Sequence, residues 1–185
     1  MKNLLIAAVA VAGTAQAQDT LLIVDLTVVD EITITSTAGL SAASVSGSDG
    51  IGFLLADFFN GGAGPGLFST GTGDLTPAAN TSDGSPVLFN FSSSVGLNVF
   101  SFTDDPDAIW NAGDQAFSGS ATFSVDPAAY AAALAGNSSG TIFAIADSDD
   151  DIAGASALGS WALIPAPSTA ALLGLGGLAA ARRRR

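Results

Sequence analysis

The side chains in this chain that can do chemistry are carboxylates. It has seventeen acidic residues, no His and no Cys, and it has no Lys or Arg between Asp19 and Ile164. A catalytic triad, a thiolate nucleophile, a Schiff base and an ordinary zinc site all require residues from that missing set. Two carboxylates about 5 to 9 Å apart suffice for glycoside hydrolysis, but no spacing in the sequence marks such a pair. We therefore expect a protein that is not an enzyme.

One stretch matches the nucleophile pattern of hydrolases, because Gly136-Asn137-Ser138-Ser139-Gly140 has the form G-x-S-x-G. In those enzymes the pattern forms the turn from a strand into a helix, and a His activates the serine. Here the pattern follows a predicted helix and precedes a predicted strand, and the chain has no His. We interpret it as a connection without a catalytic role.

Two acidic clusters offer the hard oxygen ligands that calcium prefers. One cluster is Asp104-Asp105-Pro106-Asp107, and in the other Asp147, Asp149 and Asp151 alternate along the chain. An EF-hand loop starting at Asp147 would need Gly where Ile152 stands and Glu where Leu158 stands, so that motif is not present. Two interpretations stay open: a calcium site at Asp147, Asp149 and Asp151, or solvated turns between strands. We expect no other cofactor.

Predicted strands must position these carboxylates. Between Gln18 and Ile164 the apolar residues are mostly strand formers, in short runs separated by turn residues. Several runs alternate, as in Ile32-Thr33-Ile34-Thr35, which places one face on a core and the other in water. The predicted strands are 21–29, 31–37, 52–59, 87–93, 97–103, 115–125, 141–146 and 157–163. We expect one acidic all-β domain over residues 18–164, an antiparallel jelly-roll-like β-sandwich whose aromatic residues fill the core.

One short helix and one long loop interrupt these predicted strands. Asp126 is the expected N-cap and Pro127 the first helical residue, and Gly136 closes a helix over residues 128–135. The glycine-rich stretch 60–73 has little to bury, so we expect an exposed loop tethered by Leu67 and Phe68.

Residues 1–17 have the three parts of a secretory signal peptide: a basic start at Lys2, an apolar core, and the small-residue site Ala15-Gln16-Ala17. Cleavage after Ala17 by signal peptidase, following translocation by the general secretion machinery, would leave Gln18 as the first residue. The alternative is a buried N-terminal helix.

The C-terminal residues have the features of a stop-transfer tail. An uncharged stretch over residues 161–181 runs into four arginines, Arg182, Arg183, Arg184 and Arg185, which resist translocation. Because Pro165 and Pro167 cannot continue a helix, the predicted helix begins near Ser168, and over residues 168–181 it measures ~21 Å. That is shorter than the ~30 Å hydrocarbon core of a bilayer, so we expect a marginal anchor.

A short proline motif, a weakly apolar helix and a terminal arginine cluster, in this order, resemble the PEP-CTERM sorting tail of exported bacterial proteins. The motif here is Pro165, Ala166, Pro167 and Ser168, with Ala166 where the family has Glu. The resemblance covers only the tail, residues 165–185. It implies recognition by an exosortase, removal of the anchor, and delivery to the cell surface or an extracellular polysaccharide matrix.

These features together predict an exported, non-enzymatic surface or extracellular-matrix protein that is first anchored in the inner membrane. Two alternatives stay open: a calcium-dependent or carbohydrate-binding adhesive module, and a permanently anchored envelope protein. The acidic residues between Asp19 and Ile164 have no basic partners, which disfavours binding to nucleic acid. The resemblance to PEP-CTERM tails implies an extracellular polysaccharide as a candidate partner.

Overall fold

The computed structural model describes residues 18–50, 52–61, 64–81, 86–101, 108–146, 148 and 152–164. These residues form an all-β domain with one helix, which confirms the predicted fold class at that level. The predicted signal helix and the predicted C-terminal helix lie outside the described residues.

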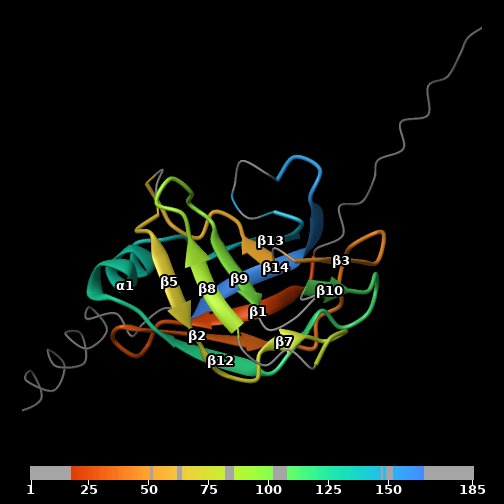
Figure 1. Cartoon of the computed structure of the whole chain (residues 1–185), viewed down its shortest axis with the longest axis horizontal. Coiled ribbons are helices and arrows are strands. Elements are labelled where there is room, and N and C mark those ends of the chain that lie inside the picture. Colours follow the sequence, from red (N-terminus) through yellow and green to blue (C-terminus); the bar gives the residue numbers. More distant parts are fainter. Residues whose placement is uncertain are drawn as a thin grey trace, which may run out of the picture.

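Ten of the described strands form one large sheet (Figure 1). Every strand pair in the described residues is antiparallel except β1 with β14, which are parallel. The order across the sheet is β5 (Leu67–Thr70), β8 (Pro86–Asn90), β9 (Leu97–Ser101), β4 (Phe53–Leu55), β13 (Ser139–Ala144), β14 (Ser156–Ile164), β1 (Thr20–Asp25), β2 (Glu31–Ser36), β12 (Ser120–Ser124) and β6 (Thr72–Gly73). Two small sheets pair β10 (Ala108–Trp110) with β3 (Gly47–Asp49), and β11 (Phe117–Ser118) with β7 (Thr76–Pro77).

Alternating side chains explain the pairing of β2 with β12. The two isoleucines of β2 are fully buried, while its threonines lie on the opposite face. There the hydroxyl oxygens of Thr33 and Thr122 are 2.9 Å apart, and those of Thr35 and Ser120 are 2.8 Å apart. Such cross-strand pairs stabilise a sheet. The buried isoleucines on one face and the paired hydroxyls on the other therefore favour the same register between β2 and β12.

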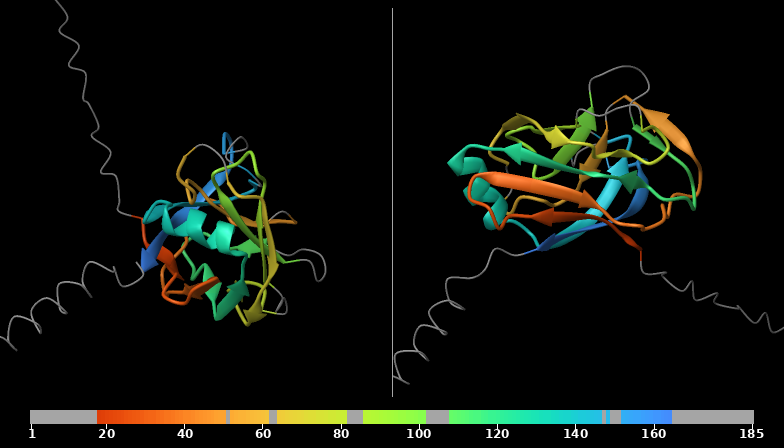
Figure 2. Two further views of the ribbon diagram at one scale, coloured as in Figure 1. Left: turned by 90° about the vertical axis from the view of Figure 1, so that its left-hand side faces the viewer. Right: turned by 90° about the horizontal axis from the view of Figure 1, so that it is seen from below.

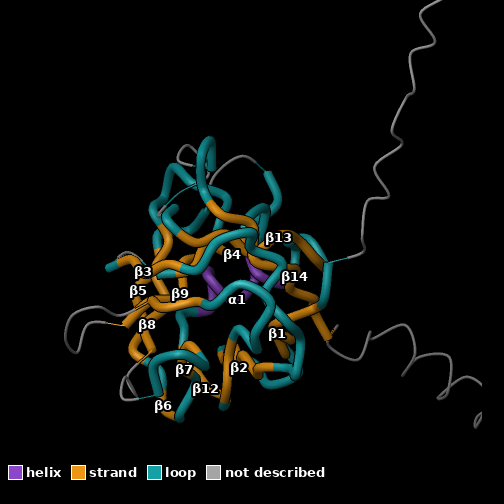
Figure 3. Tube along the Cα trace, turned by 90° about the vertical axis from the view of Figure 1, so that its right-hand side faces the viewer, coloured by secondary structure: helices purple, strands orange, loops and turns teal. Residues whose placement is uncertain are grey.

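The large sheet nearly closes on itself through the segment 67–73, which contributes both of its end strands. β5 pairs with β8, and after Gly71 the chain continues as β6, which pairs with β12. Ser69 Oγ donates a hydrogen bond to the backbone oxygen of Ser124 at 2.7 Å, which links β5 directly to β12. A Cβ atom on Gly71 would lie 2.5 Å from the ring of Phe123, so this crossing requires glycine. In Figure 3 the strands accordingly surround the core, with α1 behind it.

The prediction of an exposed loop over residues 60–73 is therefore wrong for its second half. Leu67 is buried, as expected of a tether, but Phe68 is 63% exposed. The segment has few apolar side chains to bury, yet its backbone forms hydrogen bonds with β8 at one end of the sheet and with β12 at the other. Every non-proline residue carries these hydrogen-bonding groups whatever its side chain, so composition does not reveal them.

Two predicted strands are interrupted by residues with positive φ. β4 ends at Leu55, and Asp57 has a φ of 55°, which ends the strand predicted over 52–59. Gly119, with a φ of 81°, divides the strand predicted over 115–125 into β11 and β12. A Cβ atom there would meet the backbone of Asp74, so the interruption also requires glycine.

Trp161 in β14 is the largest fully buried side chain of the described core. Its Nε1 donates a hydrogen bond to the backbone oxygen of Ala56 at 3.1 Å, and its ring centroid is 5.0 Å from that of Phe58. Phe58 in turn meets Phe59 edge to face. A Cβ atom on Gly140 would lie 2.6 Å from the indole nitrogen, so this glycine of β13 makes room for the indole.

The predicted helix is confirmed as α1 (Pro127–Leu134), which connects β12 to β13 and covers one end of the sheet (Figure 2). Asp126 Oδ1 accepts hydrogen bonds from the amides of Ala128 and Ala129, both at 2.9 Å, and thereby caps the helix. The hydroxyl of Tyr130 donates to the backbone oxygen of Leu26 at 2.6 Å, which fixes α1 to the end of β1. Within the described residues no helix has the length and apolar character needed to cross a membrane.

Candidate functional site at the paired terminal strands

Most residues with a predicted function lie outside the described part of the chain. Gln18, the residue after the predicted signal cleavage, is the first one described. The predictions for the remaining residues therefore stay predictions; these residues are Ala15 and Ala17, Pro165, Ala166, Pro167 and Ser168, Arg182, Arg183, Arg184 and Arg185, and Asp147, Asp149 and Asp151.

The first and last strands of the domain lie side by side within the large sheet (Figure 1). β1 and β14 run in parallel, and Asp25 at the end of β1 is opposite Ile164 at the end of β14. The amide of Ser160 donates to the backbone oxygen of Asp19 at 2.9 Å. Main-chain hydrogen bonds to β14 thus begin one residue after Gln18.

β14 continues as far as Ile164, the residue directly before Pro165. Near its end the amide of Leu163 donates to the backbone oxygen of Ser138 at 2.8 Å. Proline has no amide hydrogen to donate, so Pro165 cannot contribute a hydrogen bond of this kind. The sheet therefore reaches the start of the predicted sorting motif without an intervening linker.

The G-x-S-x-G stretch has a packing role at the start of β13. A Cβ atom on Gly136 would lie 2.3 Å from the backbone oxygen of Phe58, and Gly140 lies under the indole of Trp161. Asn137 Nδ2 donates to the backbone oxygen of Asp57 at 2.5 Å. Both glycines are thus accounted for by close contacts within the fold.

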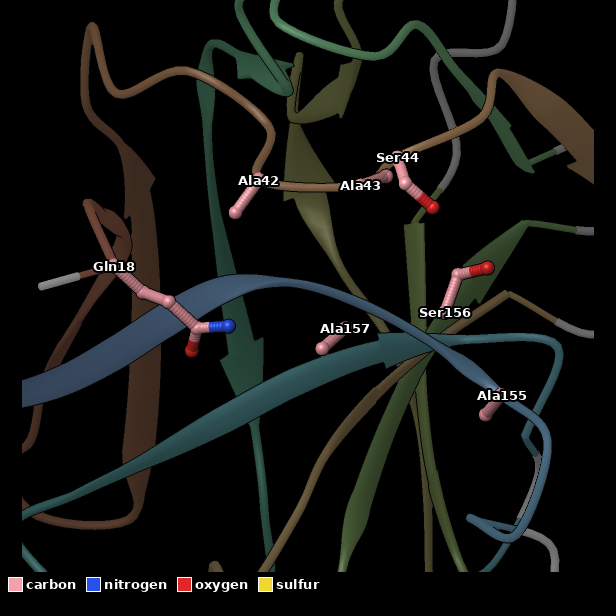
Figure 4. A pocket seen from close by; sticks show the side chains of 7 residues that line it. All are labelled: Gln18, Ala42, Ala43, Ser44, Ala155, Ser156 and Ala157. Carbon is pink, nitrogen blue, oxygen red and sulfur yellow. The ribbon is translucent and has the colours of Figure 1, made fainter. Parts of the chain in front are cut away.

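An open cavity of about 300 Å³ lies beside the start of β14 (Figure 4). Ser44 and Ser156 lie on facing sides of it in the close view. None of its lining side chains titrates near neutral pH, so the cavity offers hydrogen bonds but no acid, base or activated nucleophile. The lining residues are Gln18, Ala42, Ala43, Ser44, Ala155, Ser156 and Ala157.

In the part of the chain that the structure covers, no three His, Cys, Asp or Glu side chains converge as metal ligands. Two buried oxygens there lack a hydrogen-bond partner, Oδ1 of Asn98 and Oδ2 of Asp49. Asn98 also donates from Nδ2 to the backbone oxygen of Ala146 at 3.2 Å, just before the acidic stretch. All three residues of the predicted calcium site, Asp147, Asp149 and Asp151, lie outside the described residues.

Three phenylalanines form an aromatic cluster on the outer face of β5 and β8, and sequence reasoning missed it. Phe68 is opposite Phe89 in the register, and the rings of Phe89 and Phe91 meet edge to face with centroids 4.3 Å apart. Phe68 is 63% and Phe91 43% exposed. Alternation in the predicted strand 87–93 places Phe89 and Phe91 on one face, but only the pairing of β5 adds Phe68. Clustered exposed apolar side chains are typical of binding surfaces.

No protein-family model, curated protein or solved structure matches this chain. Its function is therefore inferred from the geometry of the domain and from the sequence on either side of it.

Proposed function

We propose that this chain is an exported, non-enzymatic protein that is processed at both ends and works at the cell surface or in an extracellular matrix. The parallel pairing of β1 with β14 carries the proposal. All described strands lie between Thr20 and Ile164, so cleavage after Ala17 and within the tail leaves the sheet intact.

In this proposal the tail determines the route. The helix over 168–181 and Arg182–Arg185 hold the precursor in the inner membrane, and an exosortase-type enzyme acts at Pro165–Ser168. β14 ends one residue before Pro165, which supports a motif that a processing enzyme reaches without unfolding the domain. Export through the general secretion machinery also suits a chain without Cys, which depends on no disulfide outside the cell.

We further infer that the nearly closed sheet is a flattened, sandwich-like barrel, close to the jelly-roll-like sandwich expected from the sequence. A nearly closed sheet offers few unpaired strand edges to neighbouring molecules. The acidic residues between Asp19 and Ile164, with no Lys or Arg among them, keep copies apart. Both properties support a protein that accumulates outside the cell in soluble form.

Mass spectrometry of the protein from the cells that produce it tests this proposal. We expect a first residue of Gln18, intact or cyclised with loss of one ammonia, and a C-terminus near Ser168. A variant with Arg182–Arg185 replaced by serine serves as the control and should escape the membrane unprocessed, because nothing stops its translocation. A native protein that still contains Arg185 would support the permanently anchored alternative, and one that retains Met1 would contradict export.

The aromatic cluster of Phe68, Phe89 and Phe91 favours carbohydrate binding as a second candidate function. The faces of sugar rings carry C–H groups that pack on aromatic rings, and the absence of basic residues between Asp19 and Ile164 favours a neutral polysaccharide. Replacing Phe68 and Phe91 together with alanine should weaken such binding about tenfold, which corresponds to ~1.4 kcal/mol. Affinity electrophoresis in neutral polysaccharide measures this. Val45→Ala, at a position that is 70% exposed and outside the cluster, should leave mobility unchanged. Equal mobility of all variants would contradict carbohydrate binding by the cluster and favour a passive structural role.

A further inference from the structure

Four apolar side chains are exposed at the end of the domain where β14 finishes, and we call this set the apolar end. Figures 1 and 2 show the tip of the β1–β2 hairpin, α1 and the end of β14 on the same side of the molecule. Val28 and Val29 at the hairpin tip are 54% and 71% exposed, Leu134 at the end of α1 is 45% exposed, and Ile164 is 44% exposed.

Hydrogen bonds hold these elements together. The hydroxyl of Tyr130 in α1 donates to the backbone oxygen of Leu26, at the base of the hairpin tip. The amide of Val125, just before α1, donates to the backbone oxygen of Asp30 at 2.9 Å. The apolar end is therefore a fixed surface built from three elements and not a set of independent loops.

The parallel pairing of β1 with β14 places the hairpin tip and the start of the tail at the same end of the domain. Because Asp25 is opposite Ile164, the chain runs into the hairpin tip in the same direction in which it leaves β14. The hairpin tip follows β1 after the three residues from Leu26 to Val28, which extend at most ~11 Å beyond the level of Asp25 and Ile164. Residues 165–167, which precede the predicted tail helix, span at most about 11 Å. The hairpin tip and the start of the predicted tail helix can therefore both lie within about 11 Å of the level of Asp25 and Ile164.

We propose that, in the anchored precursor, the apolar end docks on a zwitterionic lipid surface, with Val28 and Val29 at the level of the headgroups. This docking rests on the proposed function, because it requires the C-terminal anchor. A surface tethered by a linker this short acts at high effective concentration, so it needs little affinity of its own. Partly exposed apolar side chains of this kind gain from burial in the membrane interface.

The charges beside the apolar end determine which lipid it accepts. Asp25, Asp30 and Glu31 belong to the same hairpin, and Asp126 caps the adjoining helix. No Lys or Arg occurs in this part of the sequence to offset them. Anionic headgroups would therefore repel the domain, and the repulsion would be screened by salt. A surface of phosphatidylcholine meets no such repulsion.

A lipid-borne quencher tests the docking in the anchored precursor without its signal peptide, residues 18–185, reconstituted into phosphatidylcholine vesicles. The chain has no Cys, so Val29→Cys provides a single position for a fluorophore. Val45→Cys is the matched control, because Val45 is 70% exposed and lies next to β3 and β10, at the opposite end of the domain. Quenching of the Val29 probe should be at least about threefold stronger, since the quencher is confined to the bilayer. Adding anionic lipid should reduce this difference, and salt should restore it.

Flotation of the same vesicles separates this inference from the proposed function. Failure to float would contradict the anchor and the docking together. Flotation with equal quenching at both positions would overturn the docking alone. In a second test, the double variant Val28→Ser, Val29→Ser should still float, while a probe at Leu134→Cys loses most of its quenching. An undiminished Leu134 signal in that variant would exclude the hairpin tip as the contact.

Discussion

A chain that ends at Gly159 should not fold, whereas a chain that ends at Ile164 should be as stable as the chain that includes the tail. The five residues between these ends include Trp161, and they pair with β1 on one side and with the start of β13 on the other. Removing a buried Trp side chain alone costs about 3–5 kcal/mol. The truncation also leaves backbone groups of two buried strands without partners, and a domain has only about 5–15 kcal/mol of stability to lose.

Circular dichroism and urea unfolding of three chains, residues 18–159, 18–164 and 18–185, measure this effect. The two longer chains should share one cooperative transition with the same midpoint, because no described strand extends beyond Ile164. The shortest chain should show no cooperative transition. A midpoint that falls when only residues 165–185 are removed would contradict the domain boundary on which the proposed processing depends.

Replacing Trp161 with alanine in the chain over residues 18–164 should lower the free energy of unfolding by about 3–5 kcal/mol, the range for large buried aromatic residues. Three contacts are lost at once: the hydrogen bond to Ala56, the packing on Phe58, and the fit over Gly140. Trp161→Phe keeps most of the apolar volume but leaves the Ala56 oxygen without its partner, so its cost should be intermediate.

Urea denaturation with constant m-values measures these differences. Val45→Ala, at a position that is 70% exposed, is the control and should change the free energy of unfolding by less than about 0.5 kcal/mol. If Trp161→Ala cost no more than this control, the burial of Trp161 and its contacts with Ala56 and Phe58 would be contradicted.

The pairing of β1 with β14 also bears on export. Thr20 and Ser160, which contact each other across these strands, are 140 positions apart in the sequence. Contacts of such long range slow folding, because the intervening chain must first be brought together. We infer that β1 lacks one of its two neighbours until nearly the whole domain has emerged. Late pairing of β1 with β14 would keep the chain unfolded during the translocation that we propose.

Local patterns in the sequence were sufficient for the fold class and for α1. Period-two alternation in Ile32–Thr35 indicated a strand with one buried face, and Asp126 and Pro127 marked the start of the helix. Both signals depend on neighbouring residues only, since side-chain direction and capping are determined within a few positions. The processing predictions at the two termini are of the same local kind, and they rest on charge and apolar character along short stretches.

The tertiary structure alone decided which distant segments meet. The parallel pairing of β1 with β14, the near closure of the sheet by residues 67–73, and the meeting of Phe68 with Phe89 all join residues far apart in the sequence. These pairings use backbone hydrogen bonds that every non-proline residue can form, so side-chain patterns do not specify the partner. The apolar end arises in the same way, because three elements with unremarkable sequences present their exposed side chains together only after the sheet has curled.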